Sequence, residues 1–176
     1  MTTRYHPLSI MFTAAFALAA AAVPAKDRAE LEVKGLRIGM TRAEFTAQFP
    51  AAACHSAELC QVSTTIADTA ATFNVSFHDG VVDQAYVGKF AAADVTAVVD
   101  AFRQKFGEPD SSPARTLKNG YGGTFSCNVY TWNFANGVLT VAKFRAETLT
   151  VPEIELRSLE RIRRDQAKAS KAAADA

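Results

Sequence analysis

The sequence predicts an α+β fold in which helices pack on one face of a curved antiparallel sheet. Three observations lead to this prediction: amphipathic stretches with capping signals, segments of alternating polar and apolar residues, and Asp-Gly and Asn-Gly pairs between such segments. The expected order is a helix, two or three strands, a second helix, two strands and a last helix. The predicted domain is therefore two loosely repeated helix–hairpin units plus a C-terminal helix.

Residues 1–25 differ from the rest of the chain. They carry one charged side chain, Arg4, followed by an apolar run over 8–23 and a small-x-small end at Ala25. These are the three parts of a secretory signal peptide. The run is shorter than the ~20 residues that span a bilayer, which favours cleavage near Ala25 over an uncleaved anchor. A lipid anchor would need a cysteine at the first mature position, and the first cysteine is Cys54. We therefore expect a soluble protein that is periplasmic or secreted.

The composition excludes several classes of protein. The chain has 176 residues with 19 Lys+Arg and 18 Asp+Glu, so it is not a basic nucleic-acid-binding domain. Its 49% hydrophobic content excludes a disordered chain, and its three cysteines exclude a disulfide-dense mini-protein. Loss of Arg4 with the leader leaves 18 residues of each sign. We expect residues 26–150 to form one α+β domain with a single core.

The first helix has the clearest start in the sequence. Thr41 and Glu44 form a Thr-x-x-Glu capping box, and Met40 and Phe45 are placed as its hydrophobic staple. Because Pro50 cannot continue a helix, the signals predict a helix over 41–49.

Strand patterns follow this helix. Residues 61–66 form a plausible first strand, and residues 72–77 alternate polar and apolar side chains. Asp79-Gly80 is a strong two-residue turn that leads into a strand over 81–87. The pattern predicts a hairpin.

The second half repeats this order in outline. An apolar stripe at helical spacing predicts a helix over 90–106 that ends at Gly107. Residues 108–123 are expected to be a long connection. Strands over 124–134 and 138–144 then form a second hairpin around Asn136-Gly137.

A third helix is predicted to begin at the Thr-x-x-Glu box of Thr150 and Glu153. We expect residues 151–176 to be a C-terminal helix that becomes a frayed or disordered basic tail beyond Arg163. Its basic residues favour a solvated helix face. A weak contact with an anionic membrane surface or an acidic partner is the alternative.

One segment resembles a known family. The runs Gly39-Met40-Thr41-Arg42-Ala43-Glu44-Phe45 and Phe77-His78-Asp79-Gly80-Val81-Val82, with Cys54 and Cys60 between them, are similar to the repeat of the β-lactamase-inhibitor-protein family and to the related SmpA/OmlA domain. The latter includes the small lipoprotein of the outer-membrane barrel assembly machine. The resemblance covers about residues 35–90 and implies antiparallel strands packed across a capped helix. In the inhibitor family a cysteine after the helix pairs with one on the next strand.

The three cysteines carry two expectations. Cys54 and Cys60 in an exported chain are expected to form a disulfide that closes a small loop and contributes roughly 2 kcal/mol. A redox-active pair is disfavoured because Cys54 follows a helix C-terminus, where the dipole does not lower a thiol pKa. For Cys127 a buried inert thiol is the default. An intermolecular disulfide, or pairing with one of the other two cysteines, stays open.

The sequence shows no catalytic, cofactor-binding or metal-binding constellation. His55 and His78 are isolated, and a zinc site would need three or four converging ligands. An enzyme whose site assembles from scattered residues such as His55, His78 and Asp79 remains a hypothesis.

The leading expectation is a small, non-enzymatic protein-binding module of the cell envelope whose partner is another envelope or secreted protein. Aromatic residues that could contact this partner are Tyr121, Tyr130 and Trp132, because Tyr and Trp dominate interface hot spots. Core packing explains Tyr130 and Trp132 equally well. A narrower alternative, implied by the resemblance alone, is an inhibitor of a secreted or periplasmic hydrolase.

Overall fold

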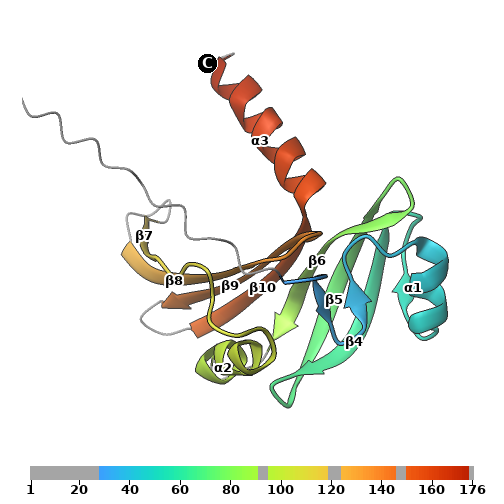
Figure 1. Cartoon of the computed structure of the whole chain (residues 1–176), viewed down its shortest axis with the longest axis horizontal. Helices are drawn as coiled ribbons and strands as arrows, with labels where there is room; N and C mark the ends of the chain where they lie inside the picture. The colour runs from blue at the N-terminus through green and yellow to red at the C-terminus, as the bar shows by residue number, and fades with distance from the viewer. Residues whose placement is uncertain (1–27, 91–94, 119–123, 146–149, 175–176) are drawn as a thin grey trace, which may run out of the picture.

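A computed structural model describes residues 28–90, 95–118, 124–145 and 150–174 of the chain. The predicted leader at residues 1–25 lies outside the described residues. The chain is α+β, with three helices, a two-stranded sheet and an eight-stranded sheet in its described part (Figure 1). The elements are β1 (Glu32–Val33), β2 (Leu36–Arg37), α1 (Arg42–Gln48), β3 (Ala53–Cys54), β4 (Leu59–Ile66), β5 (Thr69–His78), β6 (Val81–Phe90), α2 (Val95–Phe106), β7 (Ala114–Lys118), β8 (Thr124–Asn133), β9 (Gly137–Arg145), β10 (Thr150–Ser158) and α3 (Leu159–Ala174).

The large sheet is antiparallel throughout and has the order β3-β4-β5-β6-β10-β9-β8-β7. Each of the first two helices is followed along the chain by four strands of this sheet. The last strands of the two sets, β6 and β10, pair with each other in its middle.

The first helix is confirmed together with its cap. The backbone N–H of Glu44 donates to Thr41 Oγ1 at 3.2 Å, and the Thr41 N–H donates to Glu44 Oε2 at 2.6 Å. These bonds satisfy two of the N–H groups that a helix start leaves without partners. Hydrogen bonds from Thr41 lower the pKa of the Glu44 carboxyl group. The bond from the Thr41 backbone has the larger effect, and the bond from the Thr41 side chain adds to it.

The core is one buried cluster to which helices, strands and the β1–β2 hairpin all contribute. Phe45 of α1 meets Phe77 of β5 edge to face, with ring centroids 5.1 Å apart. The ring centroid of Phe102 in α2 lies 6.1 Å from that of Trp132 in β8. Burial of such large aromatic surfaces is the main favourable term for folding.

The predicted hairpins are confirmed; β5, β6 and β9 are longer than expected, whereas β8 ends one residue earlier, at Asn133. The Asp79-Gly80 turn joins β5 to β6, and both residues have positive φ, 50° and 76°, as a tight two-residue turn requires. The second hairpin joins β8 to β9. There Gly137 lies so close to β10 that an added Cβ would sit 2.5 Å from the carbonyl oxygen of Arg157.

One predicted helix start and one predicted connection are wrong. The second helix does not begin at residue 90: β6 continues to Phe90, which pairs with Ala71, and α2 begins at Val95. The predicted 108–123 connection contains β7, which pairs with β8. Both errors arise because strand pairing extends order beyond what the local pattern indicates.

The predicted helix start at Thr150 is also wrong. Residues 150–158 form β10, which pairs with β9 along its whole length and with β6 near its end. Ile154 and Leu156 are buried, whereas Glu153 is exposed and Glu155 is partly exposed, which is the two-residue period of a strand. The hydrogen bonds that β10 makes with β9 and β6 outweigh the local capping signal.

The C-terminal helix begins at Leu159 and continues to Ala174, so the expected fraying beyond Arg163 is not observed in the described residues. The Ser158 hydroxyl accepts from the Arg161 N–H at 2.9 Å and caps the helix. Figure 1 shows α3 standing away from the sheet, and none of its residues is buried. Ion pairs four residues apart, Arg161 with Asp165 and Glu160 with Arg164, support the helix.

Candidate functional site

One face of the large sheet stays partly exposed across six strands. The strand register places residues of β4, β5, β6, β10, β9 and β8 opposite one another in two adjacent rows. Most of their neighbours along each strand are buried, with Tyr130 and Ser158 partly exposed, whereas the row members are exposed or partly exposed, apart from Asn74 at 8%. We call this surface the open face; its rows are Gln61, Asn74, Tyr86, Glu155, Thr140 and Thr131, and Leu59, Ser76, Gln84, Arg157, Val138 and Asn133.

Tyr86 lies at the middle of the open face, on β6. It is 40% exposed, and it stands opposite Asn74 of β5 on one side and Glu155 of β10 on the other. A half-exposed tyrosine offers an apolar ring together with a phenolic O–H, and it loses little side-chain entropy on binding. The sequence pattern places Tyr86 in a strand, but the face it occupies follows only from the register.

Hydrogen bonds and an ion pair hold the polar side chains around Tyr86. Gln61 Nε2 donates to Asn74 Oδ1 at 2.9 Å, and Gln84 Nε2 donates to Glu155 Oε1 at 2.6 Å. Arg157 Nε lies 3.2 Å from the other carboxylate oxygen of Glu155. These contacts join neighbouring strands, so that the polar side chains of the open face are ordered.

Of the three aromatic residues predicted to contact a partner, the two that the structure describes, Tyr130 and Trp132, do not belong to the open face. Trp132 is fully buried, and its Nε1 donates to the Gly107 carbonyl at 2.8 Å, which excludes it as a contact residue in this conformation. Tyr130 is half-buried against the core. The central carbon of the Arg103 guanidinium lies 5.7 Å from the centre of its ring. Tyr121 lies outside the described residues.

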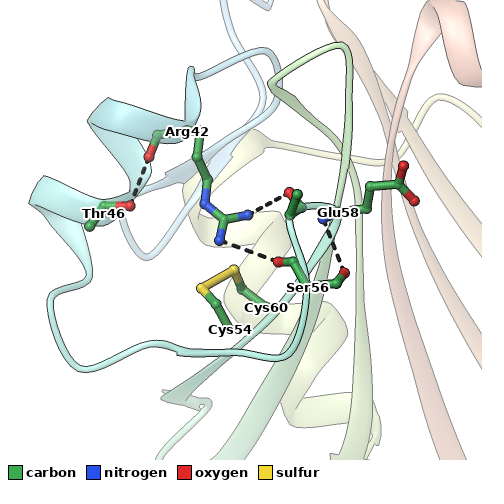
Figure 2. Close-up of a disulfide and its surroundings, with 7 residues drawn as sticks. Arg42, Thr46, Cys54, Ser56, Glu58 and Cys60 are labelled. Atoms are coloured by element: carbon green, nitrogen blue, oxygen red, sulfur yellow. Dashed lines mark hydrogen bonds between the residues drawn. A yellow bond between two sulfur atoms is a disulfide. The ribbon is translucent and has the colours of Figure 1, made fainter.

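Cys54 and Cys60 are joined by a disulfide, as expected (Figure 2). They stand directly opposite each other in the β3–β4 ladder. This excludes the alternative in which Cys127 pairs with either of them. Cys127 lies on β8, opposite Arg115 and Phe144.

Arg42 fastens the disulfide loop to the first helix. Figure 2 shows its guanidinium reaching from α1 to the loop, where it donates to the carbonyls of Ala57 at 2.7 Å and Ser56 at 3.4 Å. The same group lies 4.5 Å from the centre of the Phe77 ring. The disulfide therefore belongs to a tether between α1 and the sheet, which is a structural role.

The scattered catalytic candidates do not form one constellation. His78 Nε2 lies 3.6 Å from Asp79 Oδ2 at the exposed β5–β6 turn, and both residues line a cavity of about 300 Å³ at the base of α3. His55 is exposed in the loop after β3 and is not among the residues that line this cavity. Within the described chain no three His, Cys, Asp or Glu residues are grouped so as to hold a metal ion.

The buried carboxylate beside this cavity is already engaged. Asp83 is 4% exposed, and it accepts hydrogen bonds from Ser158 Oγ at 2.6 Å and Arg164 Nη2 at 2.5 Å. Arg161 Nη1 lies 3.6 Å from the same carboxylate. Two basic residues of the C-terminal segment, for which a solvated helix face is predicted and a membrane-surface contact is the alternative, therefore anchor the base of α3 to the sheet.

A second ion pair anchors the first described residues. Arg28 Nη1 donates to Asp110 Oδ2 at 2.6 Å, and its other N–H groups donate to carbonyls that include Phe106 and Glu108. Burial raises the pKa of Asp110, but the Asn133 backbone N–H, which donates to the same oxygen at 2.7 Å, and Arg28 outweigh it, so that the pKa lies below its ordinary value. Sequence reasoning missed this pair because its members are 82 positions apart.

In the described part of the chain, no helix combines the length and the apolar character that crossing a membrane requires. Comparisons of the sequence with protein-family models and with curated proteins, and of the structure with solved structures, give no match.

Proposed function

We propose that this chain is a small, exported, non-enzymatic protein of the cell envelope that binds another protein through the open face of its sheet. The observation that carries the proposal is Tyr86, which is 40% exposed at the centre of an ordered polar surface. Most of the large apolar side chains in the described residues are withdrawn into the core. An aromatic residue surrounded by polar side chains that exclude water is the usual composition of an interface hot spot.

The architecture supports this role through a finer interpretation of the fold. We infer that α1 with β3–β6 and α2 with β7–β10 are two loosely repeated units that meet at the β6–β10 ladder. Both helices would then lie on the core side of the sheet. Such an arrangement leaves the opposite face uncovered over both units, and a rigid sheet is a suitable platform for a binding surface.

The expected place of action is the periplasm or the secreted medium, after removal of the leader near Ala25. The Cys54–Cys60 disulfide supports this proposal because such bonds persist in oxidising compartments. Among the described residues, Asp110 and Glu44 are the carboxylates whose pKa is lowered, and each is engaged in a structural contact.

A photo-reactive phenylalanine analogue at position 86 tests the proposal in the exported full-length chain. Cross-linking in intact cells should yield one dominant protein adduct, and the same analogue at the exposed Gln166 of α3 is the matched control. The captured protein is then purified and titrated against the wild type. We expect Tyr86→Ala to weaken its binding at least tenfold with an unchanged melting temperature. Equal adducts at both positions, or unchanged affinity of Tyr86→Ala, would refute the use of this face.

An inhibitor of a secreted or periplasmic hydrolase is the second candidate. The specific observation that favours it is the Cys54–Cys60 pairing after a capped Gly-Met-Thr helix, the arrangement that the resemblance to the inhibitor family implies. The purified protein would be assayed against a panel of β-lactamases and cell-wall lytic enzymes. Inhibition that is lost in Tyr86→Ala would support this candidate, and no inhibition of any enzyme would remove it.

A further inference from the structure

One edge of the large sheet is left partly unpaired. β3 is only two residues long and covers Cys60 and Gln61 of β4. Beyond them β4 continues to Ile66, and none of the described residues pairs with its outer side there. The chain before β3 turns away, with the Ala52 N–H donating back to the Phe49 carbonyl at 3.0 Å.

The hydrogen bonds of β4 show which of its backbone groups point outward. The Leu59 carbonyl accepts from the His55 N–H on the β3 side, and the Glu58 carbonyl accepts from the Phe77 N–H on the β5 side. Because backbone direction alternates along a strand, Ser63 and Thr65 direct their N–H and C=O groups away from β5. Both residues are exposed.

The two edges of the sheet differ in chemistry. β7, at the other edge, contains Arg115 and Lys118 and follows Pro113, and charges and proline are the usual protection of an edge strand. The unpaired part of β4 is Val-Ser-Thr-Thr-Ile, which has no charge and no proline and is rich in β-branched residues. This segment has the composition of a strand that pairs.

A cavity of about 340 Å³ lies directly beside this edge. It is lined by Val62 and Ser63 of β4 and by residues 48–52, among them the half-buried Phe49 and Ala52. A second copy of β4 would not fill it, because the core-facing Val62 and Ile66 are only 6% and 3% exposed and are held in their own core. A strand from a different chain, with an apolar side chain that is not already buried in a core, would fill this cavity.

We propose that the 62–66 edge of β4 is a second binding site, which takes an extended, uncharged peptide segment as an added antiparallel strand in line with β3. Residues of this segment opposite Ser63 and Thr65 exchange backbone hydrogen bonds with them. The residue opposite Val62 places an apolar side chain in the cavity. Strand addition of this kind takes affinity from backbone bonds and specificity from alternate side-chain pockets. The site lies at the sheet edge and does not depend on the use of Tyr86.

A labelled peptide of seven alternating threonine and valine residues, with a two-lysine tail for solubility, is the probe, and fluorescence anisotropy is the readout. In an antiparallel pair, residues whose N–H groups face β4 carry side chains on the open-face side, and the intervening residues face the cavity. We therefore expect N-methylation of the threonines to weaken binding at least tenfold. N-methylation of the valines should change it less than twofold.

Protein variants test the same geometry independently. Ala51→Trp fills the cavity from an exposed position and should weaken binding at least fivefold, whereas Ala172→Trp on α3 and Tyr86→Ala should leave it within twofold. No binding up to 1 mM peptide, equal effects of the two N-methylated sets, or no effect of Ala51→Trp would each overturn the proposal.

Sedimentation of the wild-type protein and of Thr65→Lys tests whether the edge pairs with a second copy of the chain. A wild-type dimer that Thr65→Lys converts to a monomer would assign the edge to a second copy of the chain and overturn the peptide assignment.

Discussion

Arg164 of α3 donates to the buried carboxylate of Asp83 on β6 across 81 positions of sequence. Ser158, which caps α3, donates to the other oxygen of the same carboxylate. One buried acid therefore sets both where the last helix begins and how it leaves the sheet.

Asp83→Asn is expected to detach the base of α3. The variant removes the buried carboxylate that Arg164 contacts and leaves Arg164 with only its ion pair to Glu160. The lost charged hydrogen bonds should lower the free energy of unfolding by about 2 kcal/mol in urea titrations. Trypsin should then cleave α3 faster at Arg163 and Arg164. Asp165→Asn, which removes only the Arg161 pair within the helix, is the control and should cost about 0.5 kcal/mol or less. Equal losses in the two variants would contradict the anchoring role of Asp83.

Gly137→Ala is expected to be more damaging than a glycine substitution in open space. Its Cβ would lie 2.5 Å from the Arg157 carbonyl oxygen, so β9 and β10 must separate, at about 1–3 kcal/mol. Gly39→Ala is the matched control. It has no neighbour within 4 Å but a φ of +86°, and should cost about 1 kcal/mol. Urea unfolding in which Gly39→Ala is the less stable variant would show that this close approach does not matter.

Opening the Cys54–Cys60 bond is expected to loosen the α1 tether without unfolding the domain. The Cys54→Ser, Cys60→Ser double variant should lose roughly 2 kcal/mol of stability through the freed seven-residue loop. Alkylation of the denatured, unreduced protein followed by mass spectrometry should add one label, at Cys127. Three labels would show that the bond does not form, and none would show that Cys127 is itself oxidised.

The Arg28–Asp110 pair is expected to make the domain sensitive to acid. Because the pKa of Asp110 is lowered by folding, its contribution to stability is complete above the ordinary aspartate pKa of 3.8 and is lost as pH falls through the lower folded-state value. Asp110→Asn should therefore be less stable than the wild type at pH 7, with the difference shrinking below pH ~4. Urea midpoints at pH 7, 4 and 3 measure this. A difference that stays constant with pH would exclude ionisation of Asp110 as its source.

The candidate binding surface shows where sequence reasoning reaches its limit. Alternation of polar and apolar residues was enough to place Thr72–Phe77 in a strand, and β5 contains it. The same pattern could not tell which aromatic residue stays exposed. Trp132 is among the predicted contact residues and is fully buried, whereas Tyr86 is exposed and the pattern does not distinguish it. The difference lies in which face of each strand the core covers, and this is set by pairing between distant segments.

What the sequence by itself determined is local. The Thr41–Glu44 capping box, the Asp79-Gly80 turn and the Cys54–Cys60 pair each depend on groups a few residues apart, so their chemistry is written in neighbouring positions. Only the tertiary structure decided that residues 150–158 are a strand, since β6 and β9 supply the hydrogen bonds that a helix would otherwise make for itself. Burial and strand pairing add up the free energies of many contacts between segments that are distant in the sequence. They outweigh a local helix signal wherever the two compete.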